Sequence, residues 1–195
     1  MGMKKRTLGV MAALLLSARP GFAAGLPDAV AKQIPAGYDV LLWKQGALDH
    51  SGADGYLVVA HRPDDTENKP SPRPLMIFVR NADGTYRLAA RNDDVVLRAD
   101  DGGQCDPFAD AAGDGQGLTI KDRYFTVENG VACGQHWTDY ITFHYDDRLG
   151  TWLFHKQILQ SFSYDDLVNG KAGNTTVTNA NHARPVTFDA WRPER

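Results

Sequence analysis

The sequence predicts a mainly β protein (β-rich α+β), with an antiparallel, meander-like sheet and one short N-terminal helix. Short runs of β-branched and aromatic residues recur along the chain, and segments rich in Gly, Asp, Asn and Pro separate them. In the clearest run, 137–145, apolar residues alternate with polar ones, as in a strand with one buried face. Because the whole chain has 195 residues, we expect a single domain, at 24–195.

The short helix is expected near the start of that domain, at 27–34. Pro27 suits the first turn of a helix, and Pro35 ends the segment. Val30 and Ile34 stand four residues apart, so they share one face of the helix.

Strands and turns fill the rest of the domain. Apolar runs predict strands, and Gly, Pro and Asp clusters predict the loops between them. We expect strands at 38–43, 56–60, 75–79, 86–90, 95–97, 118–127 (as a hairpin), 137–145 and 151–158, with loops at 62–74, 99–117 and 171–183.

The last two strands are expected to form an antiparallel hairpin, because only a short turn, 146–150, separates them. On the second strand, Trp152, Phe154 and Ile158 are expected to continue the apolar face of the first.

Residues 1–23 have the pattern of a signal peptide. A basic start is followed by the apolar run 8–16, and small residues at Gly21 and Ala23 suit cleavage after Ala23. We therefore expect a periplasmic or secreted protein. The apolar run is too short for a comfortable membrane span, and no later run reaches 18 residues, so the mature form is expected to have no membrane span.

The charge balance excludes some partners. The full chain has 21 basic and 24 acidic residues, a net charge of −3. The leader holds four basic residues and no acid, so the mature chain has 17 basic residues against 24 acids, a net charge of −7. Such a surface repels nucleic acid and anionic lipid, and neither is expected as a partner.

The two cysteines, Cys105 and Cys133, are expected to form a disulfide bond in an oxidising compartment. Such a bond stabilises a fold by roughly 2–4 kcal/mol. Two alternatives are open: both thiols are free and buried, or Cys133 is reactive, with His136 as its base.

Two groups of polar residues are candidates for a ligand or partner face. Tyr140, His144 and His155 are expected on one face of the 137–158 hairpin, where they form either a ligand patch or an ordinary half-exposed polar face. The loop after residue 99 carries five acids that could steer a basic partner or simply face solvent. These acids are Asp100, Asp101, Asp106, Asp110 and Asp114.

Several segments, at 89–94, 105–108, 124–130 and 137–143, together resemble a group of uncharacterised exported bacterial β-domain proteins. The resemblance covers about residues 36–160. It implies a secreted β domain and assigns no catalytic residues.

The segment 47–55 resembles the loop that precedes a strand in FG-GAP/VCBS-type repeats, in a degenerate form. Such loops supply calcium with oxygen ligands at alternate positions. Asp49 and Ser51 hold two of these positions, whereas Ala47 and Gly55 replace acids. The resemblance thus makes calcium a candidate ligand, and the alternative is a turn held by its own hydrogen bonds.

These observations favour a non-catalytic binding protein of the cell envelope that is a monomer and recognises a protein or a glycan. An inhibitor or immunity-type protein is the more specific form of this expectation. No nucleophile elbow, phosphate loop or zinc motif is present in the sequence. The alternatives are a calcium-dependent structural module and an exported hydrolase. The hydrolase would need Asp106 or Asp139 beside His136 or His144.

Overall fold

The computed structural model describes residues 25–109, 116–134 and 136–193, and this part of the chain is mainly β, as predicted. The expected signal peptide, 1–23, lies outside the described residues. The helices are α1 (Asp28–Ala31) and α3 (Tyr164–Asn169). The strands are β1 (Asp39–Ala47), β2 (Asp54–His61), β3 (Leu75–Arg80), β4 (Tyr86–Asn92), β5 (Leu118–Lys121), β6 (Tyr124–Val131), β7 (His136–Asp146), β8 (Thr151–Phe162) and β9 (Asn174–Asn179). No helix in these ranges is long and apolar enough to cross a membrane.

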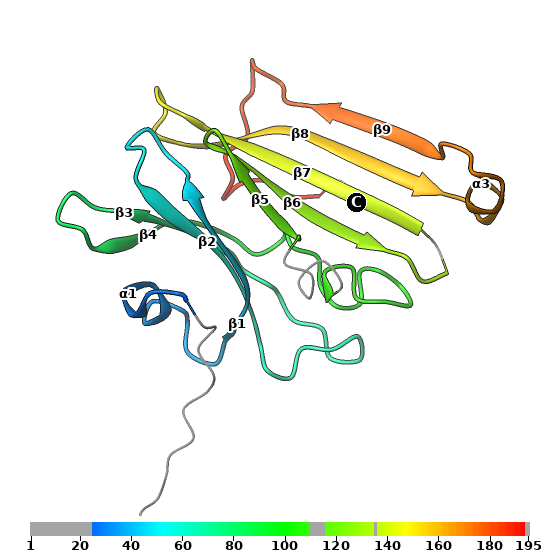
Figure 1. The fold of residues 1–195 in the computed structure, drawn as a ribbon, viewed down its shortest axis with the longest axis horizontal. Coiled ribbons are helices and arrows are strands. Elements are labelled where there is room, and N and C mark those ends of the chain that lie inside the picture. Colours follow the sequence, from blue (N-terminus) through cyan, green and yellow to red (C-terminus); the bar gives the residue numbers. More distant parts are fainter. Residues whose placement is uncertain (1–24, 110–115, 135, 194–195) are drawn as a thin grey trace, which may run out of the picture.

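The strands form two antiparallel meanders rather than a single sheet. The first sheet has the order β1-β2-β3-β4, and the second has the order β5-β6-β7-β8-β9. The edge strands β1 and β5 lie side by side, so the sheets meet along one side of the molecule (Figure 1). β9 lies in a polar segment that the sequence predicts as a loop. Its backbone pairs with β8 although all six of its residues are exposed.

The central strands of the first sheet, β2 and β3, are buried on both faces, which explains why they read as continuous apolar runs. One face, with Leu57 and Ile77, packs toward the second sheet. The other face, with Val58 and Phe78, is covered by α1 through Val30. A strand buried on both faces loses the alternating pattern of a half-buried strand.

The core between the sheets is largely aromatic. Phe143 lies at its centre, and its ring is 5.1 Å from that of Phe188 and 5.2 Å from that of Phe125, measured between centroids. Phe188 and Trp191 come from the segment after β9, which therefore closes the core.

A β-bulge in β8 changes which side chains face this core. Thr142 pairs with Lys156 and Phe143 with Phe154, so His155 is an extra residue in the ladder. Ile158 consequently pairs with Tyr140 on the outer face, and the expectation that it continues the apolar face is wrong.

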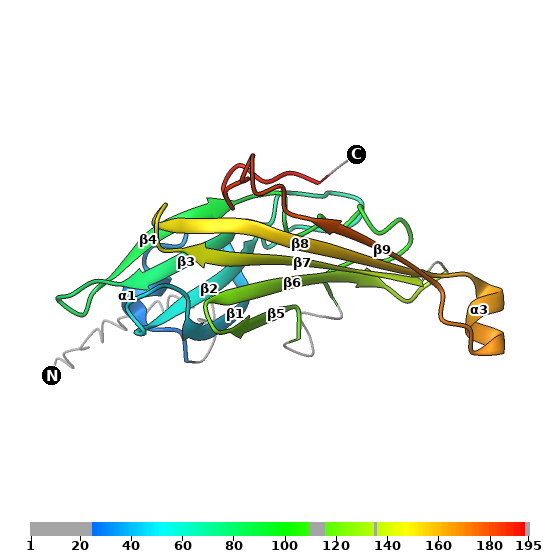
Figure 2. The same ribbon diagram turned by 90° about the horizontal axis from the view of Figure 1, so that it is seen from above.

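Beyond the bulge, the second sheet extends past the first. β7, β8 and β9 run outward to a tip that carries α3 (Figures 1 and 2). The inner face of this projecting part has no strand of the first sheet opposite it, and the candidate site lies there.

Candidate functional site

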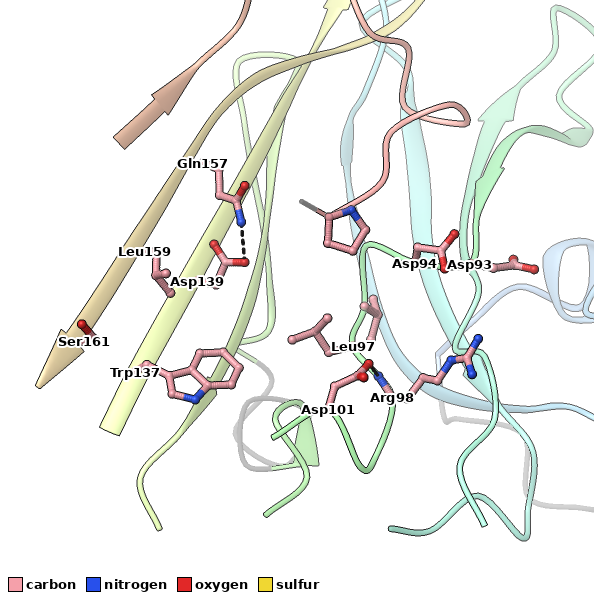
Figure 3. Close-up of a pocket in the computed structure, with 12 residues that line it drawn as sticks. Asp93, Asp94, Leu97, Arg98, Asp101, Trp137, Asp139, Gln157, Leu159 and Ser161 are labelled. Atoms are coloured by element: carbon pink, nitrogen blue, oxygen red, sulfur yellow. Dashed lines mark hydrogen bonds between the residues drawn. The ribbon is translucent and has the colours of Figure 1, made fainter. Parts of the chain in front are cut away.

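A pocket of about 550 Å³ lies between the projecting part of the second sheet and the segment that follows β4 (Figure 3). Pro193, near the C-terminus, adds to its rim.

One wall comes from the inner faces of β7 and β8. Trp137 and Asp139 are two residues apart on β7, so both point to the same side of the sheet. Across the ladder, Asp139 pairs with Leu159 and Trp137 with Ser161. Gln157 precedes this pair on the same face, and all five side chains line the pocket.

The opposite wall is the segment 93–101, which two buried asparagines hold in place. The Asn92 side-chain carbonyl accepts hydrogen bonds from the backbone N–H groups of Asp94 (2.7 Å) and Val95 (3.0 Å). The fully buried Asn129 of β6 accepts from Leu97 N–H and donates to the Val95 carbonyl, both at 3.0 Å. Because side chains satisfy this backbone, Val95–Leu97 does not form the expected edge strand.

The carboxyl group of Asp139 is the central polar group of the pocket. The residue is only 8% exposed. Its Oδ2 accepts a hydrogen bond of 2.7 Å from Gln157 Nε2, whereas its buried Oδ1 has no hydrogen-bond partner among the described residues. Burial raises the pKa of Asp139 to about 6, although the Gln157 hydrogen bond opposes this shift.

The other carboxyl groups of the pocket already have partners. Asp93 forms an ion pair with Arg91 (2.6 Å), and Asp94 forms one with Arg192 (2.9 Å). Asp101 accepts a hydrogen bond of 2.8 Å from the backbone N–H of Arg98. Asp139 differs from them in being buried and in having a buried oxygen without a hydrogen-bond partner among the described residues.

The cysteines behave as predicted. Cys105 and Cys133 lie at disulfide-bonding distance, with their Cα atoms 6.2 Å apart. This pairing confirms the first of the three interpretations and leaves no free thiol for Cys133 to act as a nucleophile.

The predicted acidic face is only partly an exposed surface. Asp100 and Asp101 are exposed, whereas Asp106 bonds through both carboxylate oxygens to the buried guanidinium of Arg73, at 2.6 and 2.5 Å. Burial raises the pKa of Asp106, but the hydrogen bonds from Arg73 and from backbone N–H groups, together with the Arg73 charge, outweigh it and hold that pKa below its usual range. Asp110 and Asp114 lie outside the described residues.

The predicted histidine face forms on the outer side of the second sheet. The His144 and His155 rings are 5.7 Å apart, and Tyr124 of β6 contacts both, at 5.5 and 5.2 Å between centroids. Tyr140 lies on the same face, opposite Ile158. Burial, with His144 nearby, lowers the pKa of His155. This cluster is separated from the pocket by the sheet itself.

The structure does not bring together the Asp–His pairs that a hydrolase would need. On β7, Asp139 is an odd number of residues from both His136 and His144, so its side chain faces the opposite side of the sheet. Asp106 is held by Arg73 instead.

The segment proposed for calcium forms a hydrogen-bonded turn. Asp49 Oδ1 accepts from the backbone N–H of Ser51 (2.9 Å) and from its hydroxyl group (2.5 Å). Within the described ranges, no three His, Cys, Asp or Glu side chains are grouped to hold a metal ion. Calcium binding by Asp49 and Ser51 stays a prediction.

Comparisons of the chain with models of protein families, with curated proteins and with solved structures found no match. The resemblance to FG-GAP/VCBS-like segments therefore also stays a prediction.

One feature of the sequence pointed to this pocket, although a search for catalytic and metal-binding motifs does not find it. Asp139 falls in phase with Trp137, Ile141 and Phe143, which are apolar and face inward. An acid at a core-facing position of an otherwise regular strand is expensive to bury, so its position alone marks it as unusual.

Proposed function

We propose that this protein is a non-catalytic binding protein of the periplasm or the extracellular space, and that the pocket holds part of its ligand. The observation that carries the proposal is the Asp139 carboxyl group, which lines the pocket with one oxygen unpartnered within the described structure. A buried polar atom without a partner costs about 1–3 kcal/mol, and a ligand that donates a hydrogen bond would recover this cost.

The composition of the pocket favours binding over catalysis. Its described lining combines apolar side chains with Asp, Gln, Ser and Arg and includes no His or Cys. Ser161 shares the sheet face with Asp139, but no imidazole in that lining stands beside it to take its proton. A mostly apolar pocket with a few fixed polar groups is the usual form of a ligand site.

The envelope location rests on the sequence. The pattern at 1–23 is that of an export signal, and the Cys105–Cys133 pair suits an oxidising compartment. The mature net charge of −7 favours a basic partner, so an inhibitor or immunity-type protein that blocks a basic envelope protein is the more specific form of the proposal.

The test compares ligand binding by the wild type with binding by a variant in which a large side chain fills the pocket. In Ser161→Trp, an indole is added on the pocket face of β8, and the matched control Leu149→Trp adds the same group at an exposed turn position. Backbone NMR spectra are recorded with a panel of charged and neutral fragments that have apolar stems.

We expect fragments to shift the amide signals of Leu97, Trp137 and Asp139 in the wild type and in Leu149→Trp, but not in Ser161→Trp. Fragment binding that centres on another surface, or binding that is equal in all three proteins, would overturn the proposal.

A further inference from the structure

We infer that the pocket recognises a primary ammonium group on an alkyl stem, with the ammonium group on the Asp139 carboxylate and the stem against Trp137 and Leu97. This inference rests on the proposed function, since it names the chemical class that the same pocket accepts. Such a group is carried by a lysine side chain and by a free alkyl diamine.

The charge argument comes from the counter-ions. Four carboxyl groups line the pocket; Asp93 and Asp94 are paired with arginines, and Asp101 accepts a backbone N–H. In the described structure Asp139 has no ion pair, and its one hydrogen bond comes from the neutral amide of Gln157. A buried carboxylate without a counter-ion attracts a cation strongly, because burial removes the water that would otherwise solvate it.

One cation, Arg98, does line the pocket, so an anionic ligand must be considered. Figure 3 shows the Arg98 side chain extending away from Asp139, on the far side of the segment 93–101. The charge that a ligand meets beside β7 is therefore that of Asp139.

The stem argument comes from the apolar surface around the carboxyl group. The Trp137 indole and the Leu97 side chain flank the space in front of Asp139 (Figure 3). Leu159, beside Asp139 in the ladder, is 40% exposed. Covering such side chains with an alkyl chain gains roughly 0.8 kcal/mol for each buried CH₂ group. An aromatic face near a cation adds a further attraction.

The experiment uses three probes that share one stem. Hexylamine, hexanol and hexanoate are titrated into the full-length mature protein by calorimetry, and they differ only in whether the end group is cationic, neutral or anionic. We expect hexylamine to bind at least tenfold more tightly than either of the others.

Two variants test whether Asp139 supplies the negative charge that hexylamine recognises. Asp139→Asn removes the charge at nearly constant shape and should abolish the tenfold preference for hexylamine. Asp147→Asn is the control, since Asp147 is an exposed acid paired with Arg123 outside the pocket, and it should leave the preference unchanged. As a measurement on the unaltered protein, the carboxyl-carbon NMR signal of Asp139 should shift when hexylamine is added.

The outcomes separate this inference from the proposed function. If hexanol or hexanoate binds the wild type as tightly as hexylamine but does not bind Ser161→Trp, the ammonium inference is wrong and the proposed binding pocket is retained. If Asp139→Asn keeps the full preference, or the Asp139 signal does not move, the ammonium group does not sit on Asp139. If no probe binds and the fragment panel also fails, both proposals are overturned.

The source of the ammonium group is decided with two further probes. Tighter binding of Nα-acetyl-lysine methylamide than of cadaverine would indicate a protein side chain, and the reverse order would indicate a free diamine. Failure of both to bind, while hexylamine binds, would overturn both sources and with them the inference.

Discussion

Two buried carboxyl groups in this molecule have opposite surroundings. The Asp65 side chain is fully buried and accepts hydrogen bonds from Ser71 and from the Nε of Arg73, at 2.6 Å. Arg73 also bonds to both oxygens of Asp106 and donates to the Leu97 carbonyl at 3.3 Å. Asp139, by contrast, has a single hydrogen bond within the described part of the chain, from a neutral amide.

The difference separates an acid that supports the fold from one that lowers its stability. In the Arg73 network every charge meets an opposite charge, and the network fastens the loop 62–74 to the segments around Leu97 and Asp106. Among the described residues Asp139 has no ion-pair partner, and it lines the pocket. Groups that cost stability in this way are concentrated at sites where a ligand or a reaction uses them.

The largest effect is expected from Arg73→Ala. Removing the guanidinium leaves Asp65 and Asp106 without their shared cation, and breaking a buried pair in this way costs about 3–5 kcal/mol. Urea denaturation measures the loss. Arg73→Lys, which keeps the charge but not the forked geometry, should lose less. A loss below about 1 kcal/mol for Arg73→Ala would mean that the network is not a main support of the fold.

Asp139→Asn is expected to change stability in the opposite direction, so that it raises the free energy of unfolding near neutral pH. The folded-state pKa of about 6 lies above the unfolded value of about 3.9, so the folded state binds the proton more tightly. This contribution to stability is fully present below about pH 4 and is lost as the pH rises through 6.

The variant cannot ionise, so its stability relative to the wild type should improve by about 2 kcal/mol between about pH 4 and pH 7. Urea denaturation of both proteins across this range measures the change. A constant difference at all pH values would show that Asp139 ionises in the folded protein as easily as in the unfolded chain.

An intermediate effect is expected from Asn129→Ala, which tests the wall of the pocket. The substitution leaves Leu97 N–H and the Val95 carbonyl without their partner, at a cost of about 1–3 kcal/mol. We also expect weaker hexylamine binding by calorimetry, because the Leu97 backbone loses the hydrogen bond that holds it in the pocket wall.

The control for the wall is Asn81→Ala, in which the lost hydrogen bond, to Thr85, lies at the exposed turn between β3 and β4. It should leave hexylamine binding unchanged. Equal loss of binding in both variants would show that the wall does not depend on Asn129.

The smallest effect is expected at the half-buried acid Asp49. Asp49→Ala removes the two hydrogen bonds to Ser51, and we expect a loss of about 0.5–1 kcal/mol that is the same with calcium as with a chelator. Thermal unfolding under both conditions measures it. A loss seen only with calcium would favour the calcium interpretation of this loop.

The parts of the fold that could be predicted from the sequence are those in which local pattern and tertiary structure agree. The 137–158 hairpin and the buried strands β2 and β3 each carry their signal in neighbouring residues. The disulfide was predictable because only two cysteines are present.

The walls of the pocket could not be predicted in this way. Asn129 holds Val95 across 34 residues of sequence, and an asparagine in a strand gives no local sign of such a partner. The edge strand β9 was missed because its stability comes from backbone pairing with β8 rather than from apolar side chains.

The bulge at His155 also determines the chemistry of the pocket. A regular β8 with the same sequence would place Ile158 next to Asp139 and turn Gln157 to the outer face. Lys156 would then take the place of Gln157 opposite Ile141, so an ammonium group would replace the neutral amide beside the carboxyl group. The composition of the site therefore depends on whether the count of residues along one strand is odd or even. An insertion in β8 directly after His155 would replace Gln157, Leu159 and Ser161 on the pocket face by Lys156, Ile158 and Gln160 in a single step, which no point substitution can do.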